Sequence, residues 1–191
     1  MKNFYVIGKP VAHSLSPKVF TYIFNKLNIN AQYLSCSPIN SIDFLKFINN
    51  NVDCFAGLNI TLPYKVDAYN FIKERDKYSN VTNTINCINN INNNLKGHNT
   101  DYYGFMKMLD RIDLSNHEIL VLGNGASART VIYALSKRTN NNIYIWGRNI
   151  KKVQMLIDDM NINNVKLYSN ILNNSYIVFN CLSIHINSNS I

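Results

Sequence analysis

The chain contains few cysteines, and their spacing excludes two common kinds of site. Its 191 residues include four cysteines, with no pair in CxxC spacing and no pair of histidines nearby. Zinc sites and disulfide frameworks both depend on such spacings. We therefore expect no metal and no disulfides, and we interpret the cysteines as small buried apolar residues in a reducing compartment.

Long apolar runs are also missing. No stretch approaches the roughly 18 apolar residues that a helix needs to cross a bilayer. The first residues, MKNF, lead directly into a predicted strand and lack the apolar core of a signal peptide. The sequence therefore predicts a cytoplasmic protein with no membrane partner.

Acidic residues are scarce. Eleven aspartates and glutamates stand against 19 lysines and arginines, which gives a formal net charge of +8. The basic residues are scattered, whereas a surface that binds nucleic acid usually gathers them in one stripe with aromatic residues between them. We therefore expect no nucleic-acid partner, and an anionic small-molecule ligand accounts better for the charge.

What the chain does contain is a regular alternation of predicted strands and helices. A hydrophobic fraction of 47% is typical of a packed globular protein. Alternating segments fill the first part of the chain, a polar break covers residues 110–117, and a β-α-β-α-β series typical of half a Rossmann fold follows. We predict an α/β protein with an N-terminal α/β domain over residues 1–110 and a partial Rossmann dinucleotide-binding domain over residues 111–191.

A glycine-rich turn joins a predicted strand of the second domain to its helix. The turn runs from Gly123 to Ala128, after the apolar strand end Val121-Leu122 and before an apolar helix. At such a junction Gly123 permits a tight turn, and Gly125 lets the backbone approach a pyrophosphate at the helix N-terminus. The alternative is a plain strand-to-helix turn that uses glycine only for its shape.

The end of the next predicted strand bears on the choice of dinucleotide. A site for NAD places a carboxylate there to accept hydrogen bonds from the ribose hydroxyls. This chain has Gly147-Arg148-Asn149, then Lys151 and Lys152, and no carboxylate before Asp158. A guanidinium suits a 2′-phosphate, so the sequence favours NADP over NAD. The alternative is that Arg148 is an ordinary surface residue.

Three further segments carry small hydroxyls, amides, one ammonium and one carboxylate. They are Ser14-Leu15-Ser16, Asn59–Lys65 and Gly97–Asp101. Ser16 stands where it would be the N-cap of a predicted helix, and Lys65 follows the end of a predicted strand. Together the segments suit a small, polyhydroxylated anion that exchanges a proton at an oxygen. Taken singly, each residue is equally compatible with a cap, a turn or a solvated helix position.

As a set, these segments resemble the shikimate dehydrogenase family over almost the whole chain. The similar stretches are Gly8–Pro17, Gly57–Lys65, Asn83-Thr84, Gly97–Asp101 with Gly104, and Val121–Arg129. The resemblance implies reversible, NADPH-dependent reduction of 3-dehydroshikimate to shikimate, a step in the biosynthesis of chorismate and aromatic amino acids. It also makes the first domain the shikimate-binding domain and the second the NADP-binding domain.

The resemblance further implies a role for each matching residue. Lys65 and Asp101 would be catalytic, since they would flank the oxygen that alternates between ketone and alcohol. Both would also bind the substrate, together with Ser14 and Ser16 at the carboxylate and Thr61 and Asn83 at the ring hydroxyls. The residues implied to contact the cofactor are Gly123, Asn124, Gly125, Ala126, Ser127, Gly147, Arg148, Asn149, Lys152 and Glu74.

The chain also departs from the family pattern. Tyr102, Ala126-Ser127 and Gly147 replace more usual residues. The family continues well beyond the strand predicted at 176–180, so we expect this chain, which ends at Ile191, to lack the usual C-terminal segment. Two alternatives stay open: a quinate/shikimate dehydrogenase that uses NAD, and a truncated shikimate-binding protein without efficient catalysis. The sequence is compatible with a monomer and with a homodimer.

Overall fold

The computed structural model of the chain describes residues 1–169 and 176–182 and consists of two compact units. The chain divides between Thr100 and Asp101, whereas the sequence analysis placed the domain boundary after residue 110. The reason is the packing of helix α5 (Asp101–Leu109) within the second unit, where its Phe105 ring lies 5.5 Å from the ring of Phe179. Residues 183–191, which the sequence analysis assigned to the second domain, lie outside the described residues.

The first unit is built on a six-stranded mixed sheet. Its strands pair in the order β2 (Ala31–Cys36), β1 (Lys2–Ile7), β3 (Gly57–Ile60), β5 (Cys87–Ile91), β6 (Asn94–His98) and β4 (Glu74–Arg75). The strands β2, β1 and β3 run parallel, whereas β5 runs antiparallel to β3 and forms a hairpin with β6. The hairpin turns at Asn92 and Asn93, whose positive φ angles of 52° and 65° are tolerated by asparagine.

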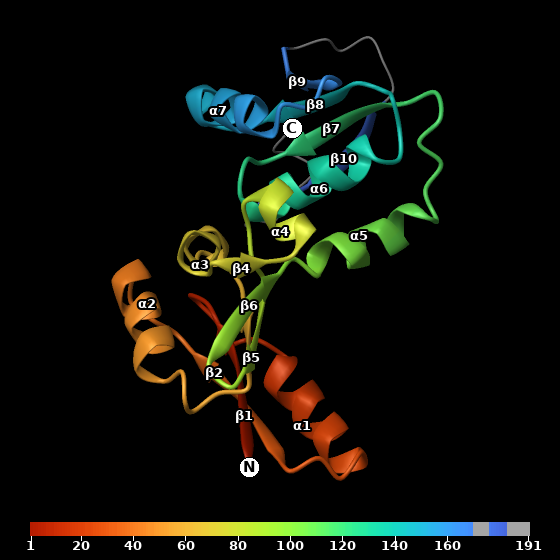
Figure 1. Ribbon diagram of the computed structural model, residues 1–191. Helices are drawn as coiled ribbons and strands as arrows, with labels where there is room; N and C mark the ends of the chain where they lie inside the picture. The colour runs from red at the N-terminus through yellow and green to blue at the C-terminus, as the bar shows by residue number, and fades with distance from the viewer. Residues whose placement is uncertain (170–175, 183–191) are drawn as a thin grey trace. The chain divides into compact units, whose positions relative to one another are not determined.

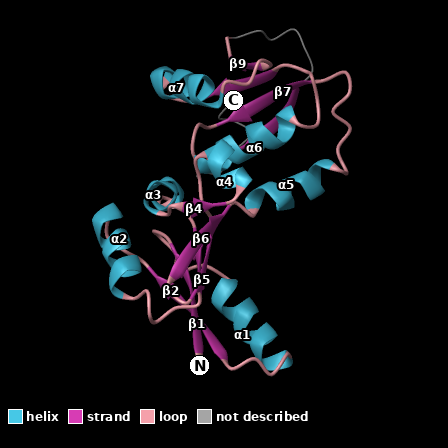
Figure 2. Cartoon of the chain, in the orientation of Figure 1, coloured by secondary structure: helices cyan, strands magenta, loops and turns pink. Residues whose placement is uncertain are grey.

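Helices cover both faces of this sheet, because successive residues of a strand point to opposite sides. On one side, α2 (Ser41–Asn50) and α3 (Lys65–Phe71) belong to the core cluster that includes Ile7. On the other side, α1 (Ser16–Lys26) belongs to the cluster that includes Val6 (Figures 1 and 2). The first unit is therefore a three-layer α/β/α structure.

The second unit contains a four-stranded parallel sheet. Its strands pair in the order β10 (Tyr176–Asn180), β7 (Glu118–Leu122), β8 (Ile143–Trp146) and β9 (Val165–Leu167), and the helices that follow β7 and β8 are α6 (Ala126–Ser136) and α7 (Ile150–Met160). This arrangement confirms the predicted α/β fold with a Rossmann-like sheet. Within the described residues, no helix has the length and apolar character needed to cross a membrane.

Three short elements were not predicted: β4, β9 and helix α4 (Lys77–Thr82). Each is too short to show a hydrophobic period in the sequence. The two strands are stabilised by pairing with neighbouring strands, and the helix is stabilised by its N-cap. Asp76 caps α4 by accepting a hydrogen bond from the backbone N–H of Ser79 over 2.7 Å.

The four cysteines are free thiols, and the interpretation that they are buried was wrong. Cys54 is exposed in the turn before β3, and the other three are half-buried. Their small size lets them occupy the margins of the two units, where a larger apolar side chain would be left partly in water.

Phe44 tests the core between α2 and α3. Its side chain is fully buried and its ring stacks on that of Tyr64, with 4.8 Å between the centroids. Because Phe44→Ala removes a buried ring and leaves a cavity, it should lower the free energy of unfolding in urea by about 3–5 kcal/mol. Ile42→Ala, in the same helix at a position that is 65% exposed, should change it by less than about 0.5 kcal/mol. Equal losses would contradict this packing.

Candidate functional site

The functional side chains of the first unit gather at one edge of its sheet. Because β1, β2 and β3 are parallel, the loops that follow them emerge at the same edge. The antiparallel strand β5 begins at this edge, since Cys87 pairs with Asn59 near the end of β3. The strand β6 ends there, since His98 pairs with Cys87. Polar residues from several distant segments of the chain therefore meet at this edge.

The loops after β1 and β3 are bound tightly to each other. A Cβ atom on Gly8 would lie 2.3 Å from Cγ2 of Thr61, so only glycine permits this approach. The Lys9 N–H donates to the Leu62 carbonyl over 2.9 Å, and the Thr61 N–H donates to the Ile7 carbonyl over 2.8 Å. These contacts hold Thr61 at the end of β3, four residues before Lys65.

Lys65 is the first residue of α3, and its side chain is half-buried. Its carbonyl accepts a hydrogen bond of 2.9 Å from the Ile85 N–H, which connects the start of the helix to the chain just before β5. Lys65 therefore lies at a helix start whose backbone is hydrogen-bonded both to the turn after β3, where the Tyr64 N–H donates to the Thr61 carbonyl, and to the chain before β5.

Ser14 and Ser16 do not cap α1, contrary to the expectation for Ser16. The helix begins at Ser16 itself, with Leu15 at the N-cap position and no hydrogen bond from a side chain at the cap. The Ser16 N–H donates to Oγ of Ser14 over 3.3 Å. Both serines are half-buried, and the first turn of α1 contains no acidic residue, so this end of the helix suits an anion.

Two nearby asparagines, Asn83 and Asn86, have different roles in the structure. Asn83 is the C-cap of α4 in the left-handed conformation, with φ 53° and ψ 38°. Asn86 instead uses its side-chain oxygen to accept from the Thr100 N–H over 2.8 Å, and its amide nitrogen donates to the Thr100 hydroxyl over 2.9 Å. Asn86 thus joins the start of β5 to the residue before Asp101. The sequence analysis did not select it, because Asn83 and Asn86 lie in similar local sequence and their strand pairing is known only from the structure.

A buried polar network fixes the segment that follows β6. Asn99 is 1% exposed, and its amide donates to the hydroxyls of Thr82 and Thr84 over 2.8 and 2.9 Å. His98 Nδ1 lies 3.7 Å from Oδ2 of Asp76. The chain is therefore held rigidly up to Thr100, and Asp101 begins α5 in the second unit.

The glycine-rich turn of the second unit has the geometry expected for close approach to a ligand. Gly123 has a φ of 112°, and a Cβ atom there would lie 3.1 Å from the Cys181 carbonyl oxygen. Among the described residues, no atom outside the adjoining chain lies within 4 Å of a Cβ built on Gly125, so this backbone is open. Gly125 is also the N-cap of α6, which has no hydrogen bond from a side chain at the cap and no acidic residue in its first turn. The turn therefore suits a phosphate group.

A pocket of about 590 Å³ lies beyond the end of β8. Its lining residues are Ile145, Trp146, Gly147, Arg148, Ile150, Leu167, Tyr168 and Ser169. No carboxylate is among them, and Arg148 is exposed. Asn149 caps α7 by accepting from the Lys152 N–H over 3.1 Å, so its side-chain oxygen is already engaged. The pocket is thus cationic and adjoins a helix N-terminus.

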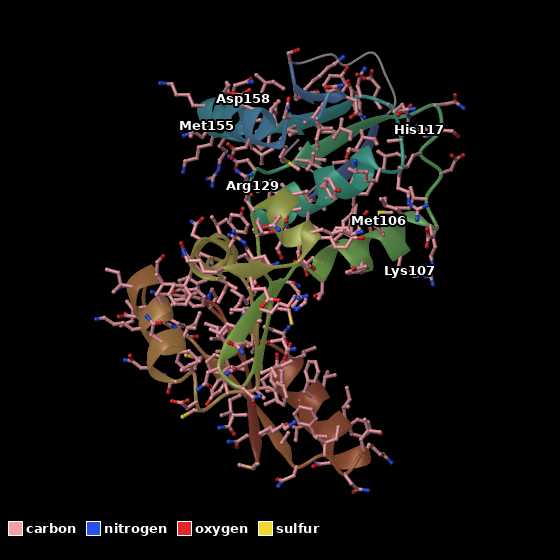
Figure 3. The ribbon with its side chains drawn as sticks, viewed as in Figure 1. Met106, Lys107, His117, Arg129, Met155 and Asp158 are labelled. Carbon is pink, nitrogen blue, oxygen red and sulfur yellow. The ribbon has the colours of Figure 1, made fainter. Side chains whose placement is uncertain are left out.

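Two further charged residues have clear partners. Glu74, which the sequence analysis assigned to the cofactor, lies on β4 in the first unit and forms an ion pair of 2.7 Å with Lys96 across to β6. Arg129 of α6, labelled in Figure 3, donates to Oδ2 of Asp159 on α7 over 2.9 Å, and so joins the two helices beside the glycine-rich turn. Among the described residues, no group of three or more His, Cys, Asp or Glu could hold a metal ion.

Family models match both units of the chain. The model described as the shikimate dehydrogenase substrate binding domain matches residues 6–88, and the model described as shikimate / quinate 5-dehydrogenase matches residues 106–187. The chain is 35% identical over 170 residues to the shikimate dehydrogenase (NADP(+)) of Clostridium perfringens, covering 85% of this chain and 61% of the relative. It is 32% identical over 164 residues to that of Nitrosopumilus maritimus, covering 82% and 58%.

A solved structure has a similar fold. The shikimate 5-dehydrogenase from Thermus thermophilus, in complex with NADP(H) and shikimate, superposes with a TM-score of 0.76 at 26% identity, covering 88% of this chain and 63% of that one. The chain thus spans less than two thirds of the length of these relatives. Because two family models match in succession and the fold agrees with a solved member, this chain belongs to the shikimate dehydrogenase family.

Proposed function

We propose that the chain acts as an NADP-dependent shikimate dehydrogenase, which reduces 3-dehydroshikimate to shikimate in the cytoplasmic synthesis of chorismate and aromatic amino acids. The observation that supports this most is the meeting of serine hydroxyls, Thr61, Lys65 and Asn86 at one sheet edge of the unit that matches the substrate-binding model. Hydroxyls, amides and one ammonium are the groups that a small polyhydroxylated carboxylate requires.

The substrate roles follow from the positions of these groups. Ser14 and Ser16, beside the N-terminus of α1, bind the carboxylate. Thr61 and Asn86 bind ring hydroxyls. We assign this role to Asn86 in place of Asn83, because Asn86 is anchored to Thr100 at the edge whereas Asn83 serves as the C-cap of α4.

Lys65 and Asp101 serve the reacting oxygen. The ammonium of Lys65 stabilises the negative charge that develops on this oxygen and donates the proton, and the carboxylate of Asp101 orients the lysine and the alcohol. NADPH, when bound, supplies the hydride.

The residues of the second unit fit NADP. The open backbone at Gly125 and the uncapped start of α6 leave room and N–H donors for the pyrophosphate, with Asn124, Ala126 and Ser127 completing the turn. Arg148, which lines the pocket after β8, and Lys152, in the first turn of α7, take the 2′-phosphate. Because the described residues that line this pocket include no carboxylate, the pocket favours NADP over the NAD of the quinate/shikimate alternative. Glu74 remains a proposed cofactor contact. The alternative role for this carboxylate is structural, since it forms an ion pair with Lys96.

Oxidation of NADPH in the presence of 3-dehydroshikimate tests the proposed function. We expect absorbance of NADPH to fall only when both compounds and the protein are present, and calorimetry to detect binding of shikimate. Shikimate binding without NADPH oxidation would favour a shikimate-binding protein without efficient catalysis. Absence of both would reject the proposal.

Replacement of Lys65 tests the chemical step. Lys65→Ala should lower the turnover number by about 10²–10⁴-fold, because a positioned acid and its charge are lost. Lys46→Ala, an exposed lysine of α2, is the matched control and should retain turnover. Near-normal turnover of Lys65→Ala would remove this residue from the mechanism.

The two asparagines make a paired test of the substrate site. Asn86→Ala should raise the Kd for shikimate about tenfold, the effect of losing roughly 1.4 kcal/mol of hydrogen bonding. Asn83→Gly should leave this Kd within about twofold, because glycine adopts the left-handed conformation without strain. The opposite ranking in calorimetry would restore Asn83 to the site.

Arg148 is the residue on which cofactor selectivity depends. Arg148→Ala should raise the Kd for NADP by about ten- to a hundredfold, because a charge-assisted bond of roughly 1.5–3 kcal/mol is lost, and should hardly affect NAD. Lys166→Ala, at an exposed position on β9, controls for the general loss of positive charge. Equal weakening of both dinucleotides would make Arg148 a structural residue.

A further inference from the structure

Tyr33 is a buried phenol behind the serine loop of the first unit. It lies on β2, is 5% exposed, and stacks on Phe20 of α1 with 4.5 Å between ring centroids and 5° between ring planes. Stacking on the helix that begins at Ser16 holds the ring in place, so the position of its hydroxyl is also determined.

The Tyr33 hydroxyl is hydrogen-bonded to a residue of the sheet edge. It donates to Oδ1 of Asn59 over 2.6 Å. Asn59 belongs to β3, two residues before Thr61, and is half-buried opposite Cys87. The sequence analysis assigned a role to Ser16 but to neither Tyr33 nor Asn59.

The phenol keeps its proton throughout the physiological range. Burial, with a smaller contribution from Cys87, raises the pKa of Tyr33 to about 12, against the opposing effect of the Ser16 side chain. A protonated phenol that donates to Oδ1 fixes which way the Asn59 amide is turned. Both N–H donors of the amide are then directed away from Tyr33.

We propose that Tyr33 is a positioning residue for the substrate: through Oδ1 it holds the Asn59 amide with its N–H donors ready for an oxygen of the bound anion, next to the Ser16 anchor. The inference rests on the proposed shikimate site. It adds Asn59 as a donor to the substrate and explains why a buried phenol stands behind a polar edge. The same ring stacks on Phe20 of α1, the helix that begins at Ser16, so Tyr33 is linked to both substrate contacts, to one through its ring and to the other through its hydroxyl.

A double-mutant cycle on shikimate binding, measured by calorimetry, tests this inference. Tyr33→Phe keeps the stacked ring and removes only the hydroxyl, and it should raise the Kd for shikimate about tenfold. Asn59→Ala should raise it by a similar factor. Because Tyr33 acts through Asn59, adding Tyr33→Phe to Asn59→Ala should change the Kd by less than about twofold. Tyr22→Phe, at an exposed position of α1, should bind as the wild type does.

A second variant tests the direction of the amide without altering Tyr33. Asn59→Asp preserves an oxygen that accepts from the phenol but has no N–H donors, so it should weaken shikimate binding by at least about tenfold while thermal unfolding shows an intact fold. Wild-type affinity for shikimate in Tyr33→Phe or Asn59→Asp would overturn the inference and leave the proposed function standing. The same holds if the factor by which the double variant raises the Kd equals the product of the factors for Tyr33→Phe and Asn59→Ala. Failure of the wild type to bind shikimate would overturn both.

Discussion

Strand β3 pairs in parallel with β1 on one side and in antiparallel with β5 on the other, and the candidate substrate site depends on this double pairing. The parallel pairing brings the loops after Ile7 and Ile60 to one edge of the sheet, where the approach of Gly8 to Thr61 binds them together. The antiparallel pairing starts β5 at the same edge, and its hairpin returns β6 there. Side chains that are distant in sequence are thereby placed together by backbone hydrogen bonds, before any of them contacts a ligand.

Fixed polar groups then prepare this edge for an anion. The buried Asn99 network and the Asn86–Thr100 hydrogen bonds hold the chain after β6, and the stacked Tyr33 holds Asn59. A site whose donors are already oriented loses little conformational freedom when it binds. The second unit is also prepared for an anion before a ligand binds. The open backbone at Gly125 and Arg148 after β8 provide positive potential, and the described residues that line the pocket after β8 include no carboxylate that would repel a phosphate.

The sequence predicted the fold where the hydrophobic pattern was long, as in β7, α6, β8 and α7, and the fold class and family are confirmed. It did not predict β4, α4 or β9, which are too short to carry a period. The domain boundary in the structure lies before α5 and not after it. The sequence of α5 shows that it is a helix but does not show which unit the helix packs against. Asn83 and Asn86 lie in similar local sequence. Only the strand pairing shows that Asn83 is the left-handed C-cap of α4 and that Asn86 has its side chain at the site. Ser16 is not the cap because it is already the first residue of the helix, with Leu15 at the N-cap position.

The proposed function requires shikimate to bind at the carboxyl edge of the first sheet. Titration of the isotopically labelled protein with shikimate, followed by NMR, measures this binding. We expect saturable shifts of amide signals from residues 14–16, 59–62, 64–65, 86 and 98–100. The hairpin tip at Asn92 and Asn93, at the far end of β5 and β6, should remain unchanged. Shifts concentrated at that tip, or no saturable shifts at all, would show that shikimate does not bind at this edge.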